Sequence, residues 1–421
     1  MHEGHHEVKD RVTSPIYTFG EDRNRMMLLA IVVGAICLGI GIALGVSSGI
    51  ARFTYAYLMN FCFFVSIALG ALFFVMSQHL TRAGWSASIR RISEILAVCI
   101  VPMGVLFIPI VVMVALKWGH PFEWNNPEWI ATADDDLRPI YEKKSAYLNS
   151  SFFIARNIAY FLIWIGTAWF LFRHSLRQDT TKSKELTLRM QSRSAPLMIL
   201  FAMTLVFCSF DWQMSLAPMW FSTIFPVYFF AGAVIGGLAA TTLTALLLQR
   251  SGRVTDEITV ENYHDMGKLM FGFVVFWGYI AFSQFMLIWY ANIPEETFWY
   301  NMRFKNPAWL NISIALLFLH LFIPFLGIMA RSVRRSKPFL VIACLYLLAV
   351  HWIDHYWIVM PQYNYDSYNL TTEFAFPIVE LMLLAGFAGL FIGSFYFIAG
   401  NRPLVPLGDP RMAEALNYKN L

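Results

Sequence analysis

The sequence predicts an all-α polytopic membrane protein with ten transmembrane helices and both termini in the cytoplasm, and three observations lead to this prediction. Only 14% of the 421 residues are charged and 58% are hydrophobic, whereas a soluble protein needs about a quarter of its residues charged. Ten apolar runs are each long enough to cross about 30 Å of hydrocarbon. Lys and Arg are concentrated in alternate connections between these runs, which sets the orientation.

The apolar runs give the expected spans and a simple domain organisation. A polar N-terminal tail (1–25) precedes a ten-helix membrane domain (26–399), and a cytoplasmic C-terminal tail (400–421) follows it. The first run is long enough to span and no small-residue cleavage pattern follows it, so a secretory signal peptide is not indicated. In chain order the expected spans are 26–46, 54–78, 92–116, 152–172, 195–218, 222–248, 267–290, 309–330, 337–359 and 375–399.

The distribution of basic residues sets the orientation. Most of the 31 Lys and Arg residues fall in the two tails and in every second connection, and such connections face the cytoplasm under the positive-inside rule. Arg156 and Lys268 lie at helix ends. The opposite side carries few basic residues, namely Arg52, Lys117, Arg138, Lys143, Lys144, Arg303 and Lys305.

One outer connection, residues 117–151, is long and acidic and contains Trp118, Trp124 and Trp129. A loop of this length is often a docking surface, but it can equally be a solvated cap over the helices, and the sequence favours neither. Its acidic residues are Glu123, Glu128, Asp134, Asp135, Asp136 and Glu142.

The cysteine pattern argues against bound redox metals. The five cysteines each stand alone in an apolar run, without a CxxC, a CxxCH or a Cys/His cluster. We therefore expect this chain to bind no c-type haem, iron–sulfur cluster or structural zinc.

Ionisable groups inside spans are costly and are functional candidates by default. At a rise of 1.5 Å per residue, Asp211 lies about 10 Å, His351 about 12 Å and Glu380 about 8 Å from the outer ends of their helices. Asp354 and His355 lie nearer the outer surface than His351. We therefore expect these five side chains to converge in the outer half of the membrane.

His351, Asp354 and His355 stand at i, i+3 and i+4 in the sequence HWIDHYW, so they share one helix face. Such a face can carry protons or hydrogen-bond a quinol. It can also be an interfacial face stabilised only by its own hydrogen bonds. A metal site would need further ligands that no spacing indicates.

Other polar residues extend the set of candidates. His320, near the middle of the eighth span, is either a proton relay or an ordinary histidine bonded to a backbone carbonyl. A haem held by His320 and His351 is disfavoured, since the two differ in depth by about 5 Å. Tyr279 and Lys268 on the seventh span, and Glu295 and Glu296 just after it, complete the proton-pathway or quinone-site candidates.

Three stretches carry a family resemblance. They run from Asp211 to Phe225 (DWQMSLAPMWFSTIF), from Ala281 to Thr297 (AFSQFMLIWYANIPEET) and from His351 to Pro361 (HWIDHYWIVMP). With ten spans and inside termini, the chain resembles one of the two membrane proteins of bacterial alternative complex III that are similar to the polysulfide-reductase NrfD family. Members commonly show an acid and a histidine where this chain has Ala217 and Met219.

The resemblance implies a fold, a role and partners. It implies two four-helix bundles, formed by the second to fifth and the sixth to ninth helices, with the first and tenth added. It also implies a multi-pass subunit of a quinol:cytochrome c oxidoreductase in the bacterial inner membrane. The implied partners are a sister NrfD-like membrane subunit, an iron–sulfur subunit, multihaem and monohaem cytochrome c subunits, and small membrane-anchored subunits. Haem c and iron–sulfur clusters would then belong to those partners.

The leading hypothesis is a subunit without a redox centre that contributes a proton pathway and, as an open alternative, a quinone site. Lipids surround such a protein, and nothing indicates a nucleic-acid partner. A purely structural scaffold is a second hypothesis. A secondary transporter is a third, although we find no matched pair of broken spans, which such folds usually show.

Overall fold

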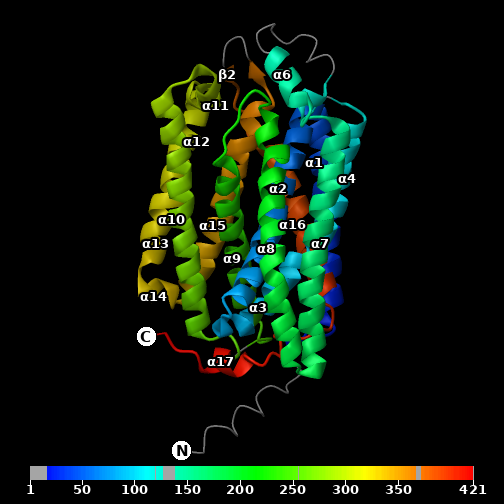
Figure 1. The fold of residues 1–421 in the computed structure, drawn as a ribbon, viewed down its shortest axis with the longest axis vertical. Helices are drawn as coiled ribbons and strands as arrows, with labels where there is room; N and C mark the ends of the chain where they lie inside the picture. The colour runs from blue at the N-terminus through cyan, green and yellow to red at the C-terminus, as the bar shows by residue number, and fades with distance from the viewer. Residues whose placement is uncertain (1–16, 119, 127–137, 255, 367–370, 421) are drawn as a thin grey trace, which may run out of the picture.

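The computed structural model describes residues 17–118, 120–126, 138–254, 256–366 and 371–420. Ten long helices lie side by side in this part of the chain (Figure 1). Within those residues ten helices are long and apolar enough to cross a membrane, so the predicted number of spans is confirmed. The first five are α1 (Asp22–Ser48), α2 (Ile50–Leu80), α3 with α4 (Ala87–Val98 and Ile100–Ala115), α7 (Ser150–Thr181) and α8 (Lys184–Trp212). The others are α9 (Phe225–Arg250), α10 (Val260–Ala291), α12 with α13 (Pro307–Leu316 and Ile323–Met329), α15 (Lys337–Val359) and α16 (Ile378–Ala399).

Short elements join the spans at the two ends of the molecule. At one end lie α6 (Arg138–Ser145), α11 (Pro294–Phe304) and an antiparallel pair of two-residue strands, β1 (Tyr365–Asp366) and β2 (Thr371–Thr372) (Figure 1). At the other end lie α14 (Arg331–Arg334) and α17 (Met412–Asn417). We call the end with α6 and α11 the outer end and the end with α17 the inner end.

Polar residues at the helix ends extend several spans beyond their apolar runs. The Asn149 side chain accepts a hydrogen bond from the Phe152 amide at 2.9 Å and so caps α7. Thr259 and Asn262 form a capping box that starts α10 at Val260, before the expected residue 267. Asn292 ends α10 in the left-handed conformation that favours a helix terminus.

The third span begins with two basic residues that the prediction placed outside it. The sequence predicts a start at residue 92, beyond the basic residues Arg90 and Arg91, but helix begins at Ala87 and both arginines are buried. Both arginines form ion pairs, which offset the cost of burying their charges inside the membrane domain. Arg52, expected in an outer connection, likewise lies within α2.

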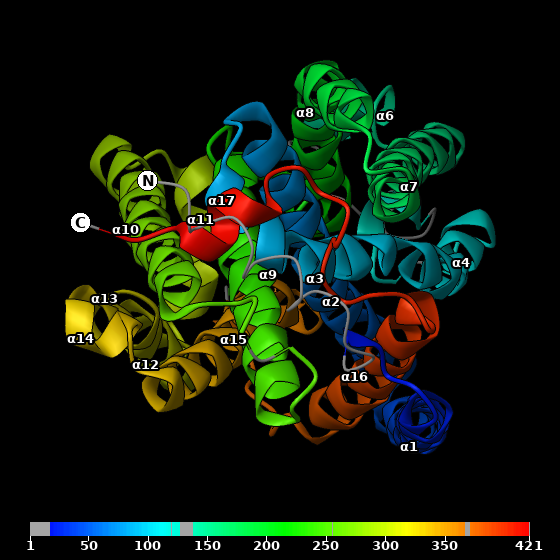
Figure 2. The ribbon, with the colours of Figure 1, turned by 90° about the horizontal axis from the view of Figure 1, so that it is seen from below.

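The helices form two four-helix bundles, as the resemblance implied. The first contains α2, α3 with α4, α7 and α8, and the second contains α9, α10, α12 with α13, and α15. Helices α1 and α16 pack against each other at the edge of the first bundle, and α17 crosses the inner end (Figure 2). Helices α2 and α9 join the two bundles at the centre.

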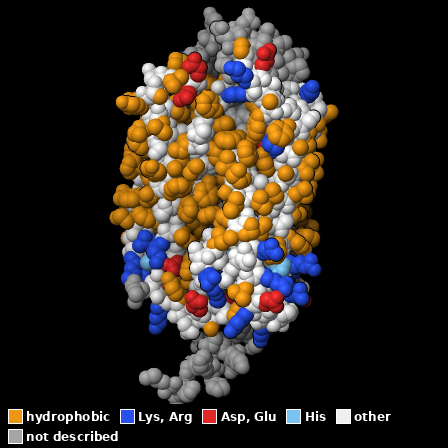
Figure 3. Space-filling model, in the orientation of Figure 1, with side chains coloured by type: hydrophobic (Ala, Val, Ile, Leu, Met, Phe, Trp, Pro, Cys, Tyr) orange, Lys and Arg blue, Asp and Glu red, His pale blue; other side chains and the backbone are white. Residues whose placement is uncertain are grey.

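Both described ends of the chain lie at the inner end, where the amide of Leu404 donates to the carbonyl of Tyr17 at 2.9 Å. On the face shown in Figure 3, hydrophobic side chains cover the middle of the molecule, and Lys and Arg side chains gather toward the inner end. By the positive-inside rule this distribution agrees with a cytoplasmic inner end.

Several aromatic residues of the described outer connections pack over the bundles. Trp124 lies between Phe122 and Phe153, with ring centroids 5.6 Å from each. The Trp220 and Trp299 rings stack with centroids 4.5 Å apart. The acidic residues at positions 128 to 136 lie outside the described part of the chain, so the choice between docking surface and cap stays open.

The contact between α2 and α9 depends on glycine. A Cβ atom at Gly70 would collide with the carbonyl oxygen of Ala233, and one at Gly237 would collide with the backbone at Gly70 and Ala71. The two backbones therefore approach as closely as small residues allow in membrane helix pairs.

We expect Gly70→Ala to lower the stability of the protein by at least about 1–3 kcal/mol, because the added methyl group forces the central helices apart. Thermal unfolding in detergent, followed by size-exclusion chromatography, measures the effect. Gly39→Ala on α1 is the matched control, since a Cβ there meets no atom within 4 Å. Equal unfolding midpoints for the two variants would contradict this account of the α2–α9 contact.

Glu123, in the 3₁₀ turn Glu123–Asn125 of the outer connection, gives a pH prediction. Burial raises the pKa of its carboxyl from 4.5 to about 7, so the folded protein holds this proton more tightly than the unfolded chain. Stability should be greatest below the unfolded pKa and fall as the pH rises through about 7. We expect Glu123→Gln to flatten the decline of the unfolding midpoint between about pH 5 and pH 8. Glu373→Gln, at an exposed outer position, should leave the decline unchanged.

Candidate functional site

The polar face of α15 is buried between its neighbouring helices. His351, Asp354 and His355 are each 2% exposed, and α9 packs directly on them. A Cβ at Gly232 would lie 2.9 Å from Cε1 of His351, and one at Gly236 would lie 3.0 Å from its Cδ2. Two glycines one turn apart on α9 therefore make room for the imidazole.

His320 reaches the same region from the eighth span. Residues Leu317–Phe322 form a π turn between α12 and α13, a local widening that often occurs at functional sites. The fully buried imidazole of His320 stacks on Trp277 of α10, with ring centroids 3.8 Å apart. Its Nδ1 lies 4.0 Å from Oδ2 of Asp354.

Asp354 is held by a tyrosine rather than by a basic side chain. The hydroxyl of Tyr228 on α9 donates a hydrogen bond to Oδ1 of Asp354. Among the described residues, the one side chain at ion-pair distance from Asp354 is His320. We call Tyr228, His320, His351, Asp354 and His355 the Asp354 cluster.

The two other histidines of the cluster bind residues of the first bundle. Nε2 of His351 lies 2.9 Å from Oγ of Ser66 on α2, and Nδ1 of His355 lies 2.8 Å from Nε2 of Gln213, just after α8. The His351 and His355 rings are 4.7 Å apart between centroids. The Asp354 cluster therefore lies at the junction of the two bundles.

Several ring nitrogens of the cluster lack a hydrogen-bond partner within the described residues. They are both nitrogens of His320, Nδ1 of His351 and Nε2 of His355. Buried polar atoms are normally satisfied, so unpaired ones mark places where a water or ligand completes the network or where a proton is exchanged. Imidazoles can accept a proton on one nitrogen and release it from the other.

Asp211 does not join this cluster. Both of its carboxylate oxygens bind Arg156 of α7, with Nε–Oδ2 3.0 Å and Nη2–Oδ1 2.7 Å, and Tyr160 donates to Oδ2 at 2.9 Å. The Arg156 guanidinium also lies 3.8 Å from the centroid of the Tyr147 ring. Asp211 is thus held in a bidentate ion pair inside the first bundle.

Glu380 forms a third, separate site. Arg52 of α2 donates from Nε and Nη2 to its two carboxylate oxygens, each at 3.0 Å. The five candidates of the outer half are therefore divided: three lie on α15, and Asp211 and Glu380 each bind an arginine of another helix.

The remaining candidates lie away from the Asp354 cluster. The side chain of Tyr279, on α10, is 66% exposed. Lys268 is paired with Asp265 at 2.5 Å near the inner end. Glu295 and Glu296 begin α11 at the outer end, where the Glu296 carbonyl accepts a hydrogen bond from Trp220.

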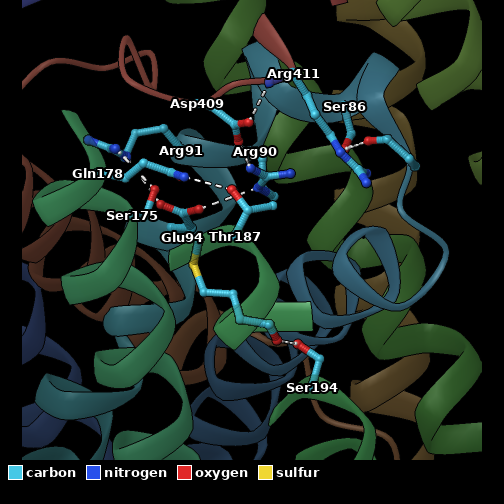
Figure 4. Close-up of polar contacts among 12 residues, drawn as sticks. Ser86, Arg90, Arg91, Glu94, Ser175, Gln178, Thr187, Ser194, Asp409 and Arg411 are labelled. Carbon is cyan, nitrogen blue, oxygen red and sulfur yellow. Dashed lines mark hydrogen bonds and ion pairs between the residues drawn. The ribbon is translucent and has the colours of Figure 1, made fainter. Parts of the chain in front are cut away.

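A buried ionic network at the inner end was not predicted from the sequence (Figure 4). Arg91 binds Glu94 at 3.1 Å and Asp179 of α7 at 2.9 Å, and it donates to the carbonyl of Pro403 at 3.2 Å. Arg90 pairs with Asp409 of the C-terminal tail. The spacing of Arg90, Arg91 and Glu94, at i+3 and i+4, is the signal that could have revealed it.

The C-terminal tail also reaches the second bundle. Asn420 donates from its amide to Oε2 of Glu261 on α10 at 3.3 Å, and Nζ of Lys268 donates to Asn420 Oδ1 at 2.9 Å. The tail therefore connects the inner ends of both bundles (Figure 2).

The described residues give no geometric support for a metal centre. No group of three or more His, Cys, Asp and Glu side chains within them is placed to hold a metal ion.

We expect Arg156→Met to destabilise the protein by about 3–5 kcal/mol, because it leaves the buried Asp211 carboxylate unpaired. The double variant Arg156→Met, Asp211→Leu should recover most of this loss, since it removes both charges. Thermal or denaturant unfolding in detergent measures both. The control Arg189→Gln breaks a pair whose side chains are 57% and 68% exposed and should cost under about 0.5 kcal/mol. A single variant as stable as that control would contradict the proposed role of the Arg156–Asp211 pair.

Comparison with known proteins agrees with the fold. No curated protein matches this chain. The family model described as "Polysulphide reductase, NrfD" matches residues 139–365, which is more than half of the chain and extends from α6 to β1. The matched region contains Asp211 and all of the Asp354 cluster and ends before Glu380. The chain therefore belongs to the NrfD polysulphide reductase family of multi-pass helical membrane proteins.

Proposed function

We propose that this chain is a membrane subunit of a bacterial respiratory quinol:cytochrome c oxidoreductase of the alternative complex III type, and that its Asp354 cluster holds and passes protons. Membership of the NrfD family supports a quinone-linked respiratory complex. Within that class, alternative complex III is favoured by the resemblance of three stretches, 211–225, 281–297 and 351–361, to one of its NrfD-like membrane proteins.

One observation carries the proton proposal. Asp354 is buried with a tyrosine and a histidine and has no arginine or lysine at ion-pair distance among the described residues, unlike Asp211 and Glu380. A carboxyl held by a permanent cation is fixed in its charged state, whereas one next to neutral groups can gain and lose a proton. The three histidines around Asp354 offer the next acceptors.

Tight packing favours protons over a quinone ring at this point. Because Gly232 and Gly236 lie directly against His351, the backbone of α9 occupies the space beside this imidazole and leaves no room there for a planar ring. A quinone, if this chain binds one, would lie elsewhere on its surface.

The proposed division of labour rests on the family resemblance and on the cysteine pattern. This chain supplies no redox centre, and electrons pass through haem c and iron–sulfur clusters of partner subunits. Those partners would be an iron–sulfur subunit, cytochrome c subunits, a sister NrfD-like subunit and small anchoring subunits in the bacterial inner membrane. This chain's own residues position and exchange protons. A purely structural scaffold and a secondary transporter are the alternative functions.

We expect Asp354→Asn in the intact complex to lower the rate of quinol oxidation, and with it the rate of proton release in vesicles, at least about tenfold, because proton transfer by a placed group contributes about a hundredfold or more to a rate. Tyr228→Phe, which removes only a hydroxyl, should give a smaller loss of the same kind. Glu373→Gln, at an exposed position of the outer end, is the control and should leave both rates unchanged.

Unchanged turnover and proton release in both cluster variants, with the complex assembled, would favour the scaffold. Substrate-dependent flux in vesicles that contain this chain alone would favour the transporter.

A further inference from the structure

A hollow of about 400 Å³ opens at the inner end, on the side where α1 and α16 meet the first bundle. It lies between the start of α1, the end of α3, the outward side of α7 and the turn that follows α16. Its walls combine two arginines and an asparagine with apolar and aromatic side chains. They are Arg23, Val98, Trp169, Phe397, Ile398, Gly400, Asn401 and Arg402.

Acidic side chains in the described part of the chain do not neutralise the basic groups of this hollow. The carboxylate of Asp22, the neighbour of Arg23, pairs with Arg253 at 2.6 Å. It therefore does not pair with Arg23. Within the described parts of the chain, neither Arg23 nor Arg402 has an ion-pair partner. The Nε atom of Arg23 is buried and has no hydrogen-bond acceptor there either.

The turn after α16 fixes the position of Arg402. Gly400 has a φ of +58°, in the left-handed region that glycine adopts readily. The chain then folds back, and Nη1 of Arg402 donates to the carbonyl of Ile398 at 2.6 Å. The guanidinium also lies 5.6 Å from the centroid of the Phe172 ring, and its other nitrogens form no hydrogen bond with the described residues.

Apolar stripes lead from the hollow toward the middle of the membrane. Val101 and Val105 follow Val98 at i+3 and i+7 and are 40% and 61% exposed. Leu162, seven residues before Trp169 on α7, is 67% exposed. Trp169 itself lies at the boundary between basic and apolar surfaces, where tryptophan is enriched in membrane proteins.

We propose that this hollow binds the phosphate headgroup of an anionic phospholipid of the inner leaflet, with its acyl chains along Val101, Val105 and Leu162. Two guanidinium groups suit a phosphate because each can donate two parallel hydrogen bonds to its oxygens. The absence of a carboxylate partner for either arginine, among the residues that the structure describes, favours a net negative headgroup over a zwitterionic one. Basic pockets between membrane helices on the cytoplasmic side bind such headgroups.

The test uses the purified full chain in detergent, stripped of lipid, with phosphatidylglycerol, phosphatidylcholine or inorganic phosphate added in parallel. We expect phosphatidylglycerol to raise the thermal unfolding midpoint by several degrees more than phosphatidylcholine, and inorganic phosphate to have little effect. In Arg23→Gln, Arg402→Gln the advantage of phosphatidylglycerol should disappear.

A matched control removes two other charges from the same end. Arg25 and Arg331 are exposed at the inner end, so Arg25→Gln, Arg331→Gln has the same net charge but an intact hollow and should respond as the unaltered protein does. Native mass spectrometry gives an independent readout. At least tenfold less bound phosphatidylglycerol is expected for the hollow variant than for this control.

Three results would overturn the proposal. They are equal lipid retention by the two double variants, an equal shift with phosphatidylcholine, and an equal shift with inorganic phosphate, which would identify a site for free anions. If the hollow variant is unstable before lipid is added, Arg23→Lys, Arg402→Lys keeps both charges and should retain a reduced preference for phosphatidylglycerol. Loss of that preference with an intact fold would also count against a headgroup site.

Discussion

The constraint that shapes this molecule is that a charge buried among membrane helices must be compensated by a group from another helix. Water cannot do this in the hydrocarbon region, and an unpaired charge there costs several kcal/mol. The bidentate contacts of Arg156 with Asp211 and of Arg52 with Glu380 meet this demand between α7 and α8 and between α2 and α16. Each pair also fixes the relative position of two helices, because its geometry tolerates little sliding.

Asp354 differs from Asp211 and Glu380 because no arginine of the described residues pairs with it. Its contacts are a tyrosine hydroxyl and a histidine ring, groups that can share a proton without holding a fixed positive charge. The neighbouring helices have local features at this point. Helix α9 has glycines against His351, and the eighth span contains a π turn at His320. Local departures from regular helix geometry often accompany function, which is why we propose the proton site at Asp354 and not at the two arginine-bound acids.

The sequence was sufficient for the fold class, because apolar length and the distribution of basic residues are properties of the chain alone. It also placed His351, Asp354 and His355 on one face, since helical periodicity relates residues three and four apart. It could not separate Asp211 and Glu380 from that face, because their partners Arg156 and Arg52 come from distant segments. Depth along a helix gives one coordinate only, so residues at a common depth were expected to meet although they lie in different places. The inner network was missed because Arg90 and Arg91 resemble the basic residues of an ordinary cytoplasmic connection.

The pairing of Arg90 with Asp409 has a consequence for how the protein is made. The two residues are 319 positions apart, so Arg90 leaves the ribosome long before its partner exists. During insertion α3 must carry two arginines with Glu94 as the only nearby acid of its own helix, and Asp179 and Asp409 arrive in turn as α7 and the tail are synthesised. The inner end of the first bundle thus reaches its final state only after translation has passed the last span, and biogenesis of the membrane domain is completed from its C-terminal tail.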